Sequence, residues 1–223
     1  MSLADLLKKR VELYWAHLKT NDPFNRALLN GTATQAMANH FLVNVRYLVQ
    51  QTPIHLRKAT AKAEKNGEEK LAKFFKLKCR EEQGHDRWAD SDIAKVNQRR
   101  IIESNSEIDP SMKGLVKHIE SIIDYDPVHY LAYIFFAEYL CVVAGFEMAE
   151  AWEKKCGFPP NSMSVISNHA ELDQHHVHEW VDITRDLLDE DKYKAPLLET
   201  VEETIKVHQQ FYQSCWQGKS HAA

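Results

Sequence analysis

Glycine and proline divide the sequence into a few long segments, and this division constrains the fold more than any other feature. The chain has only seven residues of each type. Helical periodicity predicts helices over 3–19, from 32 or 34 to 65, over 68–100, from 110 onward, and over 127–157, 162–190 and 196–216. Capping signals at the Asp-Pro pairs 109–110 and 126–127 mark two of the starts. Pro53 predicts a kink or break in the second helix. No stretch shows sustained strand alternation. The sequence therefore predicts an all-α, single-domain bundle of about seven helices over residues 1–223.

The composition and net charge of the chain argue against nucleic acid and membranes as partners. Hydrophobic residues make up 44% of the chain and charged residues 27%, an ordinary balance for a globular protein. The net charge of −4 creates no basic field for nucleic acid or an anionic membrane, and no apolar run reaches the roughly 18 residues of a membrane span. Four scattered cysteines and an N-terminus unlike a signal peptide favour a cytoplasmic protein without disulfides or a thiolate zinc site.

The segment HAELDQHHVHEW, residues 169–180, places several ionisable side chains on one helix face. At about 100° per residue, His169, Asp173 and His176 form one narrow stripe, whereas His175 and His178 point elsewhere. The residues that flank the stripe are apolar: Val165, Ile166, Leu172, Val177 and Trp180. Imidazoles and a carboxylate on a buried face are costly unless something neutralises them, and a metal ion would do so.

The segment KLKCREEQGHDRWADSDI supplies a second part of the predicted site. Glu82 and His85 have the Glu-x-x-His spacing that di-metal carboxylate bundles place on two of their helices. Asp173 and His176 repeat this spacing with a shorter acid. Gly84 is costly in the middle of a helix, so we expect a neighbouring helix or a ligand to approach closely there.

Glu138, in HYLAYIFFAEYLCVVAGFEM, is the third contribution. Its helical neighbours are apolar, so its carboxyl group needs either a raised pKa or a cation. Glu147 lies on the opposite face and is predicted to be a surface residue. The complete set of predicted metal ligands is Glu82, His85, Glu138, His169, Asp173 and His176. Oxygen and imidazole ligands without thiolate suit iron or manganese, and zinc is possible.

The first core helix, QAMANHFLVNVRYLVQQTP, contains no acid. A di-metal site normally takes a further carboxylate from such a helix, whereas this one has His40, Asn44 and Tyr47 along one face. The sequence therefore leaves both one metal ion and two metal ions open.

Simpler interpretations of the same residues compete with a metal site. His85 alone could be a hydrogen-bonded core histidine, and Glu138 could be paired with an arginine or a tyrosine hydroxyl. Cys141 has no histidine beside it in the sequence, which favours an inert core thiol. The remaining histidines are expected to be ordinary, and four aromatic residues are expected to be core or pocket wall: Tyr133, Phe135, Phe136 and Tyr139.

The stretches EEQGHDRWADSDI, FFAEYLCVVAG and HAELDQHHVHEW, in this order and spacing, resemble the heme-oxygenase-like fold superfamily. That group includes TenA-type proteins, PqqC-type oxidases and heme-oxygenase-like dimetal oxidases and decarboxylases. The resemblance covers roughly residues 30–216. It implies a seven-helix bundle with a central pocket, often dimeric, whose metal-binding members activate O2 on a small organic substrate. It also implies that the six predicted ligands bind metal, while the glutamate of the family's first core helix has no counterpart, with Asn44 or Tyr47 nearest.

The leading hypothesis is an iron-dependent oxidase or oxygenase with one or two ions, acting as a homodimer on a small molecule and O2. In this hypothesis Tyr47, Tyr139 or Trp88 lines the pocket or passes electrons. A metal-free PqqC-like or TenA-type enzyme and a non-catalytic protein that binds a ligand or partner are the alternatives. The catalytic cysteine of TenA-type enzymes could correspond to Cys141. The Gln-Asp pair on their first core helix, however, is replaced here by Asn44-Val45.

Overall fold

The computed structural model describes residues 1–97, 107–188 and 190–217, and every regular element in these ranges is helical. The elements are α1 (Leu3–Asn21), α2 (Pro23–Leu29), α3 (Gln35–Lys65), α4 (Glu69–Glu81), α5 (Asp86–Val96), α6 (Pro110–Tyr125), α7 (Pro127–Glu150), the π-helical turn η1 (Ala151–Lys155), α8 (Ser164–Leu187) and α9 (Glu190–Gln217). The all-α prediction is confirmed. The predicted number of about seven helices is too low, because the sequence does not predict α2 and because segment 68–100 contains two helices.

Aspartate caps begin three of the helices, each directly before a proline. The Asp109 carboxylate accepts a hydrogen bond from the Ser111 backbone N–H at 2.8 Å, and the Asp126 carboxylate accepts one from Val128 at 2.9 Å. These bonds satisfy N–H groups that have no partner inside the helix, which confirms the predicted starts of α6 and α7. Helix α3 continues through Pro53, so this proline does not end it.

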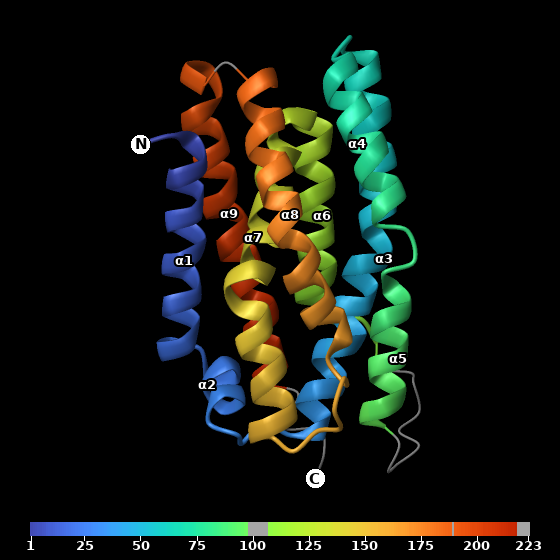
Figure 1. Cartoon of the computed structure of the whole chain (residues 1–223), viewed down its shortest axis with the longest axis vertical. Helices are drawn as coiled ribbons and strands as arrows, with labels where there is room; N and C mark the ends of the chain where they lie inside the picture. The colour runs from blue at the N-terminus through green and yellow to red at the C-terminus, as the bar shows by residue number, and fades with distance from the viewer. Residues whose placement is uncertain (98–106, 189, 218–223) are drawn as a thin grey trace.

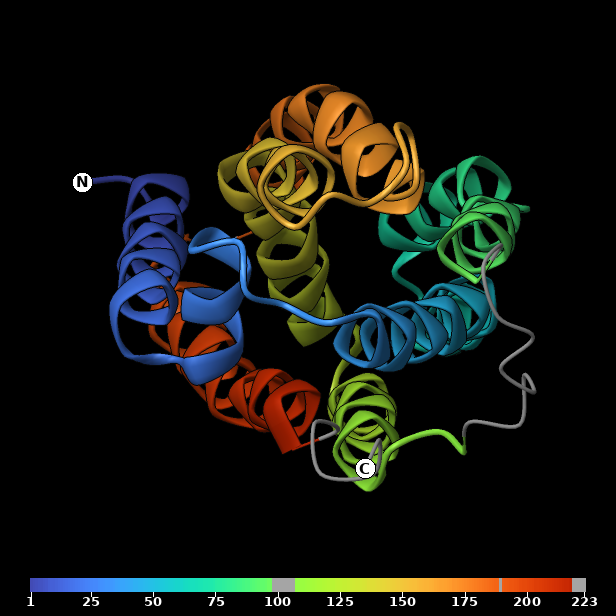
Figure 2. The ribbon, with the colours of Figure 1, turned by 90° about the horizontal axis from the view of Figure 1, so that it is seen from below.

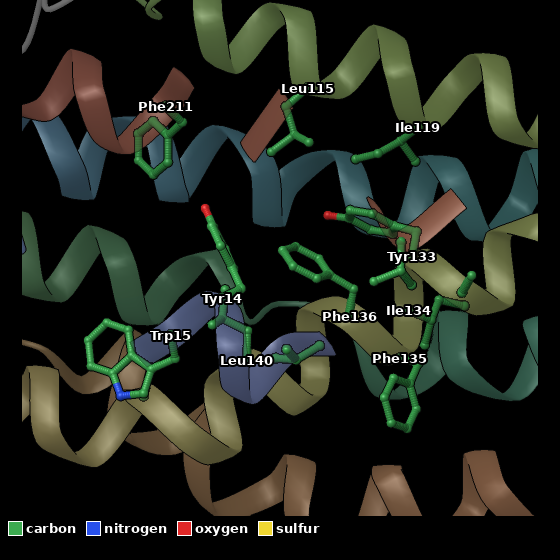
Figure 3. Close-up of a cluster of buried hydrophobic side chains, with 14 of the residues drawn as sticks. Tyr14, Trp15, Leu115, Ile119, Tyr133, Ile134, Phe135, Phe136, Leu140 and Phe211 are labelled. Carbon is green, nitrogen blue, oxygen red and sulfur yellow. The ribbon is translucent and has the colours of Figure 1, made fainter. Parts of the chain in front are cut away.

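Helix α7 is the central element of the bundle. Figure 2 shows it in the middle of the molecule, where it contacts α1, α3, α6, α8 and α9. Its aromatic side chains spread toward different neighbours (Figure 3): the Phe135 ring centroid lies 4.5 Å from that of Trp180, and the Phe136 centroid lies 5.2 Å from that of His208. The expectation that no apolar segment is long enough to cross a membrane is corrected here, because Pro127–Lys155 is long and apolar enough. However, 61% of its apolar window is buried inside the bundle. A helix surrounded on all sides by others must be apolar all round.

The predicted helix 68–100 is interrupted between Glu81 and Asp86, and its last residues, 98–100, lie outside the described part. Figure 1 shows α4 and α5 one above the other beside α3. The break includes Gly84, which has a φ of +88°, a conformation that L side chains rarely adopt. No neighbouring helix makes the expected close approach at Gly84, because among the described residues a Cβ there would meet only the Arg87 side chain, 4.0 Å away.

Candidate metal centre

Three parts of the bundle contribute to the candidate site: the turn between α4 and α5, helix α7 and helix α8. Helices α7 and α8 pack closely at Gly145, where a Cβ would lie 2.7 Å from the Cβ of Ala170. This close packing lets Glu138 of α7 lie beside Asp173 and His176 of α8.

The Glu82 cluster consists of Glu82, His85 and His169. Oε2 of Glu82 lies 3.1 Å from Nδ1 of His85 and 3.9 Å from Nε2 of His169. Nδ1 of His169 lies 2.6 Å from the Val165 carbonyl oxygen, and because a carbonyl can only accept, Nδ1 carries the proton. This hydrogen bond fixes the ring so that Nε2 faces Glu82, in the way that partners of metal-binding histidines orient them. The Trp88 ring stacks on His85 at a centroid distance of 4.2 Å.

Charge interactions within the Glu82 cluster are strong. Burial raises the pKa of Glu82, but its contacts with His169 and His85 outweigh burial and hold the pKa well below its usual range. Burial lowers the pKa of His169, whereas Glu82 and Asp173 raise it by more, so the net shift is upward. The cluster therefore favours a positive charge beside a carboxylate.

The Glu138 cluster consists of Glu138, Asp173 and His176, all of them buried. Nδ1 of His176 lies 3.0 Å from Asp173 Oδ1 and 3.6 Å from Glu138 Oε1, while its Nε2 lies 3.8 Å from Glu81 Oε2. Burial raises the pKa of Glu138 to about 8, against the opposing charge of Lys78. Oε2 of Glu138 is buried and has no hydrogen-bond partner among the residues that the structure describes.

Lys78 is a buried cation that sequence reasoning missed. Its side chain is only 2% exposed, and Nζ lies 3.1 Å from Glu179 Oε2, 3.4 Å from Glu81 Oε2 and 3.5 Å from Glu138 Oε1. Burial lowers the pKa of Lys78, but these acids raise it by more, so the group stays an ammonium ion. The signal was present in the sequence, since Lys78 follows Leu71 and Phe75 at helical spacing on the apolar face of α4.

A cavity of about 170 Å³ adjoins both clusters. Its wall is mostly apolar, with side chains from α3, α7, α8 and α9, and its charged residues are Lys78, Glu82, Glu138, His169 and Asp173. Tyr130 and Tyr133 of α7 and His208 of α9 also line it. The cavity can therefore hold a small, mainly apolar molecule next to the ionisable groups.

Several residues considered in the sequence lie outside the cavity wall, among them Tyr47 and Tyr139. The Tyr139 hydroxyl donates to Glu12 on α1 at 2.7 Å, so it faces a different part of the molecule. Asn44 is occupied by hydrogen bonds to the His40 carbonyl and the Asp109 backbone N–H. Helix α3 contributes no acid to the wall; its lining residues are Phe41, Val45, Leu48, Val49, Thr52 and Leu56.

The donor set of the Glu82 cluster suits a metal ion. One ligand atom from each of its three residues lies within 4.8 Å of the other two. Two imidazoles and one carboxylate form the set that non-heme Fe(II) oxygenases use, leaving further positions open for O2 and substrate. The Glu138 cluster has two carboxylates and one imidazole within the same limit, but Lys78 already lies against one of those carboxylates.

Solved structures with this architecture have low sequence identity to the chain. A domain of unknown function with a heme oxygenase-like fold from Shewanella denitrificans is 21% identical, with a TM-score of 0.84, and the match covers 96% of this chain and 92% of that one. A TenA homolog from Pseudomonas syringae pv. tomato is 16% identical, with a TM-score of 0.71 and coverage of 96% and 93%. A CADD-like protein of unknown function from Nostoc punctiforme is 13% identical, with a TM-score of 0.73 and coverage of 96% and 97%.

No protein-family model matches the sequence, and no curated protein matches it either. The structural matches confirm the heme-oxygenase-like fold that the three sequence motifs resemble. At these identities they show the fold alone, so function has to be argued from the site.

Proposed function

We propose that the protein is an iron-dependent oxidase or oxygenase that uses O2 to oxidise a small, mainly apolar organic substrate. The observation that carries this proposal is the Glu82 cluster, in which two imidazoles and one carboxylate converge beside an apolar cavity. Manganese or zinc would fit the same atoms, but zinc has no redox chemistry with which to activate O2. The expected homodimer and cytoplasmic location are part of this proposal.

The residues of the site have distinct roles in this function. Glu82, His85 and His169 would hold the iron, which when bound supplies the one-electron chemistry that O2 requires. The Val165 carbonyl keeps His169 in the required orientation through Nδ1. The apolar wall binds the body of the substrate and excludes water. Glu138, whose pKa burial raises to about 8, can hold a proton at the cavity wall near neutral pH.

Anaerobic reconstitution with Fe(II) tests the proposal. We expect the native chain to bind iron and to consume O2 with at least one member of a panel of small apolar alcohols, amines, aldehydes and acids. His85→Ala should lose the iron. His118→Ala is the matched control, because His118 contacts Thr204 at 3.1 Å outside the cavity wall, and it should retain iron. Less than one tenth of an equivalent of iron bound by the native chain would contradict the proposal.

A metal-free enzyme of the PqqC or TenA type is the second candidate. It is favoured by Lys78, which neutralises buried acids without any metal, and by the absence of an acid in the part of the cavity wall that α3 forms. In that case substrate turnover should survive dialysis against a strong iron chelator. A non-catalytic binding protein would instead consume no O2, while Asp173→Ala would change its affinity for a ligand.

A further inference from the structure

Among the described residues, three groups could hold a metal ion, and two of them already contain an acid paired with Lys78. One group is the Glu138 cluster, and the other combines Glu81, His176 and Glu179. Nζ of Lys78 lies within 3.5 Å of a carboxylate oxygen in each group. In the Glu82 cluster, by contrast, the ion-pair partners of Glu82 among the described residues are the imidazoles of His85 and His169.

The ammonium group of Lys78 is held in place from three sides. It has three N–H donors, and acids from three helices lie around it: Glu81 on α4, Glu138 on α7 and Glu179 on α8. Its side chain is 2% exposed, and three helices enclose it. A divalent ion bound to Glu138 Oε1 would share this oxygen with a second positive charge, and like charges this close in a buried site repel strongly.

We propose that Lys78 is the resident cation of the Glu138 cluster, so that the protein binds a single metal ion, at the Glu82 cluster. The inference rests on the proposed function only for the position of that ion. Lys78 is a positioning residue here: its fixed positive charge lies 3.5 Å from Oε1 of Glu138 and keeps a second ion out. Asp173 and His176 then support this ion-paired network through their 3.0 Å contact and do not act as ligands.

Metal stoichiometry measured with Mn(II) tests the inference. Equilibrium dialysis of the native chain should give one equivalent, and electron paramagnetic resonance should show an isolated Mn(II) ion. Lys78→Met removes the charge at nearly constant length and should raise the stoichiometry to two equivalents, with the two ions magnetically coupled. Lys78→Arg keeps the charge and should still bind one. The matched control is Lys76→Met on the same helix, whose Nζ lies 3.7 Å from Glu64 Oε1 in an exposed ion pair; this variant should bind one equivalent.

Two equivalents in the native chain, or one in a folded Lys78→Met variant, would overturn the inference. Variants that leave Lys78 in place give a second test if Lys78→Met does not fold. His85→Ala should bind no Mn(II), whereas Asp173→Asn should retain one equivalent. Loss of the ion in Asp173→Asn would place it in the Glu138 cluster and refute the role of Lys78.

The same measurements separate this inference from the proposed function. If the native chain binds no Mn(II) or Fe(II) but Lys78→Met binds one equivalent that Asp173→Asn then removes, the Glu82 site is wrong and the role of Lys78 stands. If neither chain binds metal, both proposals fail. Two equivalents in the native chain would leave an iron-dependent function intact while refuting the single-ion inference.

Discussion

The pKa values of two histidines in the wall of the same cavity are shifted in opposite directions. Burial lowers the pKa of His169, but Glu82 and Asp173 reverse the shift and raise it. Burial alone acts on His208 and lowers its pKa to about 4. Its Nδ1 lies 3.0 Å from the Tyr14 hydroxyl, and burial raises the pKa of Tyr14 well above its usual value, so this partner stays an uncharged hydroxyl. Burial is common to both sites, and the nearby carboxylates decide the sign.

The difference divides the cavity wall into two regions. Around His169 the side chains attract cations, whether a proton, an ammonium group or a metal ion. Around His208 the neighbours are the aromatic rings of Phe136, Phe211 and Tyr212, which suit the apolar part of a substrate. Under the proposed function, a substrate would lie with its reacting group toward the Glu82 cluster and its apolar body toward α9.

Replacing one histidine in each region should give the largest contrast. We expect His169→Ala to weaken Mn(II) binding by more than 100-fold, because loss of a ligand should exceed the about 10–100-fold that loss of a ligand's hydrogen-bond partner costs. His208→Gln should leave Mn(II) affinity within about twofold, since no atom of His208 belongs to a candidate ligand group. Competition with a fluorescent chelator measures both affinities, and equal losses in the two variants would contradict the division.

Much of the fold could be predicted from the sequence because its signals are local. The Asp-Pro pairs at 109 and 126 indicate where α6 and α7 begin, because the capping bonds do not depend on which other helices pack against these two. The break after α4 could not be predicted in this way. A glycine among polar residues can stay in a helix or adopt a positive φ, and tertiary packing decides which occurs at Gly84.

The candidate site could be located in part by the same periodicity. A polar residue on an apolar helix face is buried with that face, which is how Glu138 and the stripe on α8 were found. The same rule places Lys78 on the buried face of Leu71 and Phe75. It does not predict a buried lysine by itself, because lysine is seldom fully buried. Periodicity does not tell which aromatic side of α7 borders the cavity, and the structure has Tyr133 there while Tyr139 faces α1.

The pH dependence of stability should separate the two regions in metal-free protein. Because the pKa of His208 is about 4 when folded and about 6.5 when unfolded, the unfolded chain takes up the proton first as the pH falls. The contribution of neutral His208 to the free energy of unfolding is complete above about pH 6.5 and is lost toward pH 4. About 2 kcal/mol of it is lost by pH 5. His208→Gln should therefore lose about 2 kcal/mol less stability than the native chain between about pH 7.5 and 5.

Urea unfolding at the two pH values measures this difference. His178→Gln, at an exposed position on α8, is the control and should follow the native pH dependence. An unchanged slope in His208→Gln would show that His208 is not held neutral by its surroundings.

The close packing of α7 on α8 should be sensitive to a single methyl group. Gly145→Ala would place a Cβ 2.7 Å from the Cβ of Ala170 and 3.2 Å from the Ile166 carbonyl oxygen. We expect a loss of roughly 1–2 kcal/mol in unfolding free energy, since overpacking forces backbone shifts. The second substitution Ala170→Gly should restore most of it. Absence of rescue in urea unfolding of the double variant would mean that the two helices do not meet at this point.

The smallest effect we expect concerns two glycines with similar free space and different backbone conformations. Gly84 has a φ of +88°, and the nearest atom to an added Cβ is 4.0 Å away. Gly114 lies within α6, and a Cβ there would meet nothing within 4 Å. Gly84→Ala should destabilise the protein by about 1 kcal/mol because the left-handed region is unfavourable for L side chains. Gly114→Ala should stabilise it by up to about 1 kcal/mol, because alanine favours the helix interior.

Gly84 also lies on the path of the chain from Glu82 to His85, so its replacement should act on the candidate metal centre as well as on stability. Gly84→Ala should weaken Mn(II) binding several-fold, whereas Gly84→Asn, which tolerates this conformation better, should preserve most of the affinity. Gly114→Ala should not change it. If Gly84→Ala bound Mn(II) as tightly as the native chain, the turn between α4 and α5 would not be what holds Glu82 and His85 in register for a common ion.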